Sequence, residues 1–211
     1  MSRPTRWRNL DTVREDELRR SVSLLGVRIV RMLDYVEGEL DQVNFDHLVG
    51  RIVEPIRMHQ PQVIMSFGPD GVTGDVDHVV LSKAVAAAYR RAAQPLAYED
   101  DLDEDQVAWQ AAKLYQLVVP PADVEALGAL APADGYGSPG DPTLSIDLGE
   151  LARLKLAAIS RHVSQTGSAG PFHDWGADRR DAFLAAEHYR LAASVLPAPV
   201  GGEGGLFDGL A

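Results

Sequence analysis

The feature that most constrains the fold of this chain is a short apolar run that leads at once into a glycine-rich loop and then into an alanine-rich helical pattern. The apolar run covers residues 62–67, the loop 68–74 and the helical pattern 79–93. A short apolar run bounded by turn residues is typical of a buried strand, and glycine with proline at the next positions predicts a loop. This order predicts a strand–loop–helix unit of a parallel sheet, whose strand ends are the usual rim for ligands.

Hydrophobic spacing predicts further elements on both sides of this unit. Helices are expected over residues 12–25, 43–59, 147–165 and 178–195, and strands over 27–33 and 113–119. Thr12 is the expected N-cap of the first helix, and Pro55 is expected to bend or interrupt the second. The alternation of helix and strand predicts an α/β fold with a mostly parallel sheet flanked by helices.

Charge and composition exclude several classes of protein. The 211 residues carry a formal net charge of −11, which argues against nucleic acid or an anionic membrane surface as a partner. There is no cysteine, so disulfides, thiolate nucleophiles and cysteine-ligated metals are excluded. No apolar run reaches the ~18 residues of a membrane span, and no secretory signal is expected. We therefore expect a cytoplasmic protein with one α/β domain over residues 1–196 and a flexible, glycine-rich tail over 197–211.

Two carboxylates and an imidazole follow the glycine-rich loop within four residues: Asp75, Asp77 and His78. Two interpretations are open. This donor set suits zinc or another divalent ion, although zinc wants three or four protein ligands. Alternatively, Asp75 or Asp77 caps the following helix and His78 lies in its first turn. Further along the chain, His162 is expected near the C-terminal end of a helix, where a positive charge is favoured.

An acidic run over residues 99–105 resembles a calcium loop only in its alternation. An EF-hand loop that starts at Asp101 needs glycine at position 106 and a bidentate acid at position 112, where this chain has Gln106 and Ala112. We therefore expect a solvated acidic loop here.

Several pieces of the sequence, in the same order, are similar to motifs of the PIG-L/LmbE-like family, the zinc-dependent N-acetylglucosaminyl deacetylases. They are Arg14-Glu-Asp-Glu-Leu18, Leu24-Leu-Gly-Val27, Leu33-Asp-Tyr-Val-Glu-Gly38, Gly68-Pro-Asp-Gly-Val-Thr-Gly-Asp-Val-Asp-His78, Lys155-Leu-Ala-Ala-Ile-Ser-Arg-His-Val-Ser-Gln165 and Glu187-His-Tyr-Arg190. The resemblance extends from about Thr5 to Leu191.

The resemblance implies a Rossmann-like fold and a metal-dependent hydrolase that removes the N-acetyl group from an N-acetylglucosamine-type sugar. It implies zinc as the cofactor, with His78 as a metal ligand. Asp75 and Asp77 fall at catalytic positions of the loop, where Asp77 orients the loop. The positions that face the sugar or stand at the rim of its site in the family are Arg14, Glu37 and His162.

The chain departs from the family pattern in two ways. The His-Pro-Asp-Asp motif of the family's first strand–helix–strand unit is absent, and Asp75 replaces the first histidine of the loop. A carboxylate at this position would repel a developing oxyanion. We therefore expect weak or absent zinc binding, an impaired deacetylase, and association with a second copy or a partner strand through exposed sheet edges. The alternatives are a non-catalytic relic that binds a sugar-like ligand or a protein partner, and an active enzyme whose recorded start lies downstream of the true one.

Overall fold

The computed structural model describes residues 10–72, 74–98, 106–120, 123, 141–167, 172–197 and 204–210. The chain divides into two compact units. The first comprises Met1–Met32 and Asp147–Glu187, and the second comprises Leu33–Ile146 and His188–Ala211. The acidic loop expected at 99–105 and part of the expected tail lie outside the described residues. None of the described helices has the length and hydropathy that a membrane span requires.

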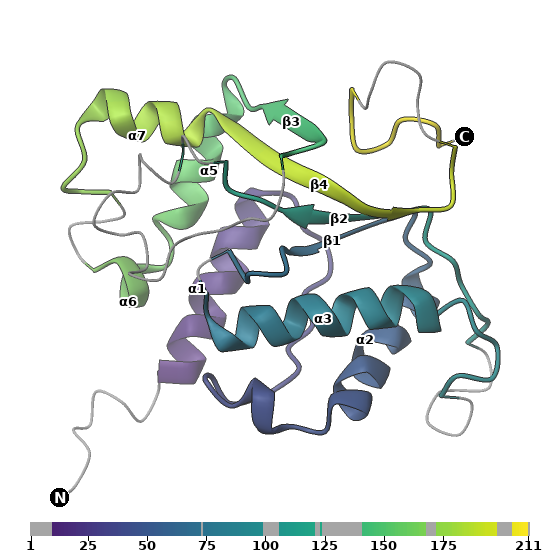
Figure 1. The fold of residues 1–211 in the computed structure, drawn as a ribbon. Coiled ribbons are helices and arrows are strands. Elements are labelled where there is room, and N and C mark those ends of the chain that lie inside the picture. The colour runs from purple at the N-terminus through teal and green to yellow at the C-terminus, as the bar shows by residue number, and fades with distance from the viewer. Residues whose placement is uncertain are drawn as a thin grey trace, which may run out of the picture. The chain divides into compact units, whose positions relative to one another are not determined.

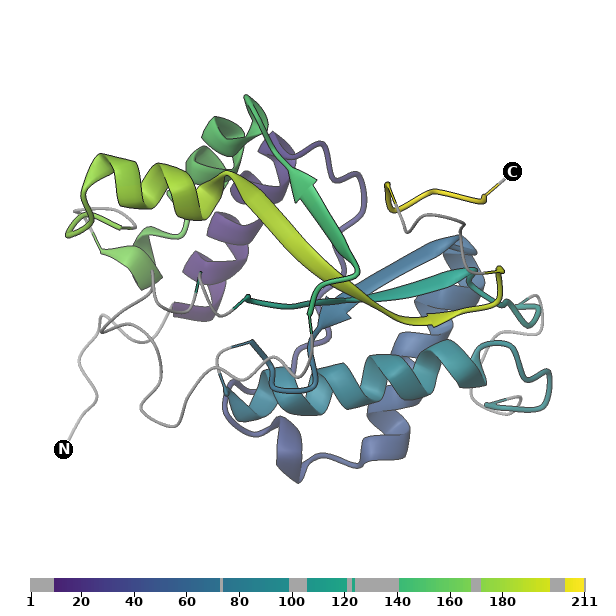
Figure 2. The same cartoon turned by 45° about the horizontal axis from the view of Figure 1, so that its top comes forward.

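Most of the sheet belongs to the second unit, and its strand order is β1-β2-β4-β3. Strand β1 (Val63–Phe67) pairs in parallel with β2 (Lys113–Leu117), and β2 pairs in the antiparallel sense with β4 (Ala186–Ser194). Strand β3 (Leu144–Asp147) lies beside β4 at one edge (Figure 2). The predicted α/β class is confirmed, and the sheet is a mixed one.

Helices α2 (Phe45–His59) and α3 (Val76–Arg91) pack against each other, and α3 also contacts β1 and β2 (Figure 1). Val49 and Val53 of α2 share one buried cluster with Ala84 and Ala88 of α3. A short 3-10 helix, η2 (Leu40–Gln42), precedes α2 and adds Leu40 to this cluster. The cluster fixes the helix whose first turn carries Asp77 and His78.

Arg57 ties α2 to the C-terminal end of α3. Its side chain is 3% exposed. Its Nε donates to the Ala92 carbonyl oxygen at 3.2 Å, and its Nη2 donates to the Gln94 carbonyl oxygen at 2.6 Å. Carbonyl groups at a helix end lack partners within the helix, so the guanidinium satisfies them. Burial lowers the pKa of Arg57 from its usual value. Helix α2 continues through Pro55, so the interruption expected there is not found.

The first unit is helical. Helix α1 (Leu10–Leu24) contacts α5 (Leu151–Ile159) and α6 (Val163–Thr166), and α5 contacts α7 (Ala177–Leu184). Helix α1 begins two residues before Thr12, so the prediction of an N-cap there is wrong and Thr12 lies within the helix. Asp11 in the first turn provides the negative charge that a helix start favours.

The helix expected over 178–195 is wrong in its second half. The chain leaves α7 after Leu184 and continues as strand β4, in which Tyr189 lies opposite Leu117 of β2. Tyr189 is buried with Tyr115 and Leu144, whereas its neighbours along the strand are only partly buried. Backbone pairing with β2 and burial of the tyrosine outweigh the helical spacing of the alanines.

The helix expected over 147–165 is divided into shorter elements. Asp147 ends strand β3, and α5 begins only at Leu151. At the other end, the Ser160 hydroxyl donates to the Leu156 carbonyl oxygen at 2.7 Å, and the chain leaves α5 before α6 begins. Serine hydroxyls compete for backbone carbonyls in this way, which weakens a helix.

The strand expected over 27–33 is also wrong. In the structure this segment is irregular, and Val27 and Ile29 are 46% and 63% exposed. The alternation of apolar and polar residues is typical of a strand, but a strand also needs a neighbouring strand to pair its backbone N–H and C=O groups. None of the described strands pairs with this segment.

Candidate functional site

Asp75 caps the helix that follows the glycine-rich loop. Its Oδ1 accepts hydrogen bonds from the backbone N–H groups of Asp77 at 2.8 Å and His78 at 3.4 Å. Its backbone is extended, as an N-cap requires, and α3 therefore begins at Val76, three residues earlier than the predicted helix. The capping interpretation of Asp75 is confirmed by this geometry.

Asp77 joins the start of α3 to the turn that contains Glu37. Its Oδ2 accepts from the backbone N–H of Gly38 at 2.6 Å, and its Oδ1 accepts from that of Leu40 at 3.0 Å. Carboxylates make short, strong hydrogen bonds to backbone donors. The Glu37 position is thereby brought beside the first turn of α3.

His78 is held on two sides. Its ring stacks on that of Phe67, with centroids 4.1 Å apart and an interplanar angle of 10°. Its Nδ1 lies 3.2 Å from the Gly71 carbonyl oxygen. In the tautomer with the proton on Nδ1, the imidazole donates to the Gly71 carbonyl oxygen, and this bond fixes the orientation of the ring together with the Phe67 stack.

The loop between β1 and α3 lies close against the first turn of the helix. A Cβ at Gly71 would lie 2.9 Å from the Cβ of His78 and 2.9 Å from the backbone nitrogen of Val79, and the φ of Gly71 is +68°. The next residue, Val72, also has a positive φ of 67°, which is strained for a β-branched side chain. Such strain persists only where the surrounding contacts impose it.

In the first unit, Glu17 of α1 holds the start of α6. Its two carboxylate oxygens accept from the backbone N–H of Ser164 at 2.8 Å and from the Ser164 hydroxyl at 2.6 Å. The hydroxyl is the largest cause that holds the pKa of Glu17 below its usual value, and burial acts in the opposite direction. The Ser164 N–H and the charges of His162 and Arg14 lower the pKa further. Two residues predicted to bind substrate therefore share one carboxylate neighbour.

His162 also lines a cavity of about 850 Å³ in the first unit. Most of its wall is aliphatic, with Leu25 of the segment after α1 and Leu151 and Leu154 of α5. Lys155 and Glu187 also line it and form an ion pair of 3.0 Å. A pocket with an apolar wall and a few polar groups is the usual form of a small-molecule site.

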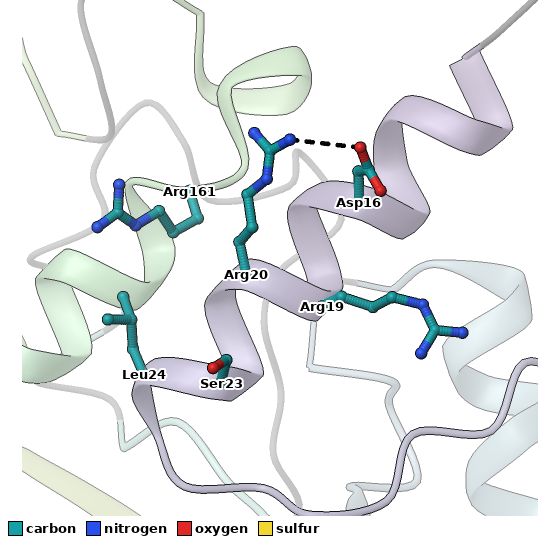
Figure 3. Close-up of a pocket in the computed structure, with 6 residues that line it drawn as sticks. All are labelled: Asp16, Arg19, Arg20, Ser23, Leu24 and Arg161. Carbon is teal, nitrogen blue, oxygen red and sulfur yellow. Dashed lines mark hydrogen bonds and ion pairs between the residues drawn. The ribbon is translucent and has the colours of Figure 1, made fainter.

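A basic hollow lies on the first unit, although the whole chain is acidic. It has a volume of about 430 Å³, and Arg19, Arg20 and Arg161 line it (Figure 3). Arg20 donates to Asp16 at 3.3 Å, and Arg19 donates to Glu15 at 2.7 Å. These exposed pairs are each worth little stability. The hollow is a local exception to the negative charge of the protein.

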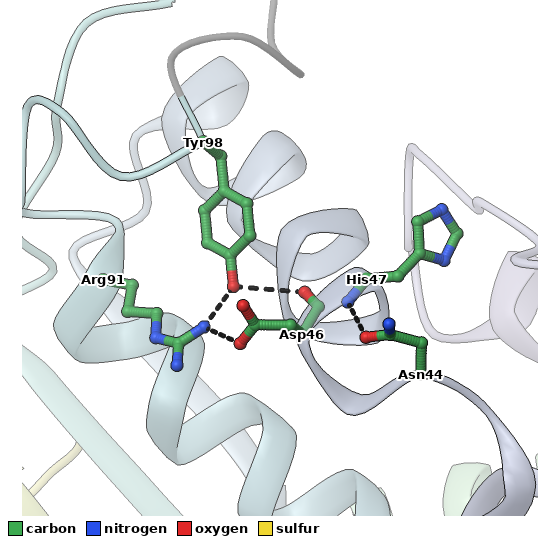
Figure 4. A network of polar contacts seen from close by, with 5 residues as sticks. All are labelled: Asn44, Asp46, His47, Arg91 and Tyr98. Atoms are coloured by element: carbon green, nitrogen blue, oxygen red, sulfur yellow. Dashed lines mark hydrogen bonds and ion pairs between the residues drawn. The ribbon is translucent and has the colours of Figure 1, made fainter.

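A polar network lies at the surface of α2 in the second unit. Arg91 of α3 donates to the Asp46 carboxylate and to the Tyr98 hydroxyl, and that hydroxyl donates to the Asp46 carbonyl oxygen at 3.1 Å (Figure 4). The amide oxygen of Asn44 accepts from the backbone N–H of His47 and caps α2. The network joins α2 to α3 and supports the helix that carries His78.

The structure places the predicted site residues in two groups. Glu37, Asp75, Asp77 and His78 lie in the second unit, and Arg14 and His162 lie in the first. Sequence reasoning missed Gly71 and Phe67 beside His78, and it gave no role to Glu17 and Ser164. The last two stand inside the quoted motifs Arg14–Leu18 and Lys155–Gln165, so their place in a motif was the signal that could have found them.

The donors around His78 do not fit a zinc ion. Zinc sites in proteins use three or four protein ligands. Both oxygens of Asp77 and one oxygen of Asp75 face backbone N–H groups. Within the part of the chain that the structure describes, no group of three histidine, aspartate or glutamate side chains is placed to hold a metal ion. Among the described residues, His78 is therefore not part of a donor group that could hold a metal ion.

Residues 1–89 match the family described as PIG-L: GlcNAc-PI de-N-acetylase. The chain is 30% identical to the 1D-myo-inositol 2-acetamido-2-deoxy-alpha-D-glucopyranoside deacetylase of Geodermatophilus obscurus, over 79% of this chain and 61% of that protein. It is 32% identical to the protein of the same name from Kineococcus radiotolerans, over 79% of this chain and 51% of that protein. The chain thus spans little more than half the length of these curated relatives.

The fold is similar to that of the N,N'-diacetylchitobiose deacetylase from Pyrococcus horikoshii. The TM-score is 0.66 and the identity 19%, over 85% of this chain and 63% of that one. At this identity the likeness concerns the fold alone. The sequence match shows that residues 1–89 of this chain are a PIG-L family domain.

Proposed function

We propose that this chain acts on the N-acetyl group of an N-acetylglucosamine-type sugar as an amide hydrolase, and that its weak hold on zinc impairs the reaction. The family match and the names of the two relatives support the sugar amide as the substrate class. The observation that carries the proposal is the bridge from Asp77 to Gly38 and Leu40, which holds the Glu37 turn against the first turn of α3, where His78 lies.

Each predicted site residue has a role in this proposal. His78 supplies the imidazole of the loop, and Phe67 and the Gly71 carbonyl oxygen fix its ring. Asp77 orients the loop, and Asp75 stands at the catalytic loop position while it caps α3. By the family resemblance, the proposed sugar-binding position of the second unit is Glu37, and those of the first unit are Arg14 and His162.

Zinc content tests the metal part of the proposal. The protein is dialysed against zinc, and the bound metal is measured after removal of free zinc. We expect well below one zinc per chain, and less still in His78→Ala. His59→Ala is the matched control, because His59 is exposed at the C-terminal end of α2. One tightly held zinc per chain would contradict the proposal.

Amine release tests the reaction. The chain is incubated with N-acetylglucosamine linked to inositol, and the free amine is measured. We expect slow release that His78→Ala abolishes and His59→Ala preserves. Rapid turnover by the chain alone would overturn the impairment, whereas release that does not depend on His78 would overturn the assignment of the site.

A second candidate is a protein that binds the sugar without hydrolysing it. The commitment of the Asp75 and Asp77 carboxylates to backbone N–H groups favours it, because these groups then hold the loop rather than a metal or a proton. Titration with N-acetylglucosamine, followed by NMR or calorimetry, distinguishes this candidate from the amide hydrolase. Saturable binding together with no amine release supports this candidate.

A further inference from the structure

A serine, a histidine and an aspartate lie in line on the β3–β4 side of the sheet, all in the second unit. The Ser145 hydroxyl lies 2.8 Å from Nδ1 of His188. On the other side of the ring, Nε2 of His188 lies 3.4 Å from Oδ2 of Asp123. Ser145 is exposed, and the side chains of His188 and Asp123 are 21% and 30% exposed.

Pairing of the strands places these side chains together. The backbone N–H of Thr143 donates to the Tyr189 carbonyl oxygen at 2.9 Å, which sets Ser145 of β3 across from His188 of β4. The His188 carbonyl oxygen accepts from the N–H of Val118 at 3.0 Å, and this bond holds β4 against the residues that follow β2. Asp123 belongs to that part of the chain, and its N–H donates to the Pro120 carbonyl oxygen at 2.9 Å.

The arrangement is that of an activated nucleophile. A serine hydroxyl is a weak nucleophile until an adjacent base takes its proton, and the base works best when a third group orients it. Asp123 favours the tautomer with the proton on Nε2, which leaves Nδ1 to accept from Ser145. The two ring nitrogens are exchanged relative to the usual serine triad, but each group has the same role.

We propose that Ser145, His188 and Asp123 form a second reactive site, separate from the His78 loop, in which Ser145 attacks carboxylic esters. An ester suits an exposed serine, because an alkoxide leaves more readily than the amine of an amide. This reaction does not involve the N-acetyl sugar or a metal ion, so it stands apart from the function proposed above.

The reaction balances with water as the only co-reactant. Ser145 Oγ forms a bond to the ester carbonyl carbon while its proton passes to Nδ1 of His188. The carbon–oxygen bond to the alcohol then breaks, and His188 returns the proton to the departing oxygen. Water attacks the acyl-serine, gives one proton through His188 to Ser145, and releases the carboxylic acid.

A fluorophosphonate probe tests this site directly, because an activated serine displaces its fluoride and keeps the phosphorus. The intact protein is treated with the probe, and the labelled peptide is mapped by mass spectrometry. We expect the adduct on Ser145 and none in Ser145→Ala. Ser194→Ala is the matched control, since Ser194 is an exposed serine of β4 whose hydroxyl bonds the backbone of Leu196. We expect the Ser194→Ala variant to be labelled at Ser145 at the full rate.

Variants of His188 and Asp123 test whether Ser145 is labelled because these residues activate its hydroxyl or only because it is exposed. His188→Gln lowers the labelling rate about a hundredfold, the usual contribution of a general base. Asp123→Asn lowers it by less than His188→Gln does, because Asp123 acts only through the histidine, and Asp123→Glu, which keeps the carboxylate, retains more of the rate than Asp123→Asn. Circular dichroism confirms that each variant is folded. An unlabelled Ser145 in folded protein, or equal labelling in His188→Gln, would overturn the proposal.

Discussion

The backbone N–H of Gly38 donates a 2.6 Å hydrogen bond to the carboxylate of Asp77, which lies 39 residues further along the chain. The same carboxylate accepts from Leu40 at 3.0 Å. Asp77 lies in the first turn of α3, next to His78. One side chain thus sets the position of the Glu37 turn relative to the only imidazole in the loop motif.

Replacing Asp77 tests this bridge. Asp77→Ala leaves two backbone donors without their acceptor and should lower the free energy of unfolding by about 1.5–3 kcal/mol, the usual contribution of a hydrogen bond to a charged group. Urea denaturation followed by circular dichroism measures the loss. Asp41→Ala is the control, because Asp41 is an exposed carboxylate in η2. An equal loss in both variants would show that the bridge contributes nothing.

Two glycines of the β1–α3 loop provide a matched pair. Gly71→Ala puts a methyl group 2.9 Å from both the His78 Cβ and the Val79 nitrogen, at a φ of +68°. Gly74→Ala meets open space at a φ of +72°. The conformational cost of about 1–2 kcal/mol is common to both. We expect Gly71→Ala to lose clearly more stability than Gly74→Ala and to shift the NMR signals of the His78 ring. Equal losses would show that the loop does not depend on this close approach.

Strand β1 and helix α3 of the second unit could be predicted from the sequence, because residues close together in the chain determine them. The strand at 63–67 and the helix that follows are encoded by an apolar run, a glycine-rich loop and an N-cap, all within about 30 residues. Strand β4 is different, because alanines at helical spacing hide an element that depends on pairing with β2. Tyr189 is buried through contacts from distant parts of the chain.

Part of the candidate site could also be predicted from the sequence. Asp75, Asp77 and His78 lie within four residues of one another, so the sequence alone places them together. The bond from Gly38 to Asp77 depends on tertiary packing, and the motifs that contain these residues indicate no contact. Glu17 and Ser164 are separated by 147 residues, and only the fold of the first unit brings them together.

The pH dependence of stability tests Glu17. Its native pKa lies below the usual value, so its carboxylate stabilises the fold fully above the unfolded pKa of about 4.3, and this stability is lost as the pH falls through the native pKa. Glu17→Gln should therefore lower stability at neutral pH and weaken the acid dependence of the unfolding free energy. Urea denaturation from pH of about 7 to about 3 measures both. Glu15→Gln, at an exposed ion pair with Arg19, should leave the acid dependence nearly unchanged.

The irregular segment between α1 and η2 predicts self-association. Its apolar side chains are exposed, including Val27 at 46%, Ile29 at 63% and Val36 at 62%. Exposed apolar residues with the alternation of a strand favour pairing with another chain, because burial in a partner removes them from water and satisfies the backbone. We expect sedimentation velocity to show concentration-dependent association of the wild type, and the double variant Val27→Ser, Ile29→Ser to shift the population toward monomer. Val195→Ser, at 59% exposure outside this segment, is the control and should leave association unchanged. A wild type that stays monomeric at high concentration would exclude the segment as an interface.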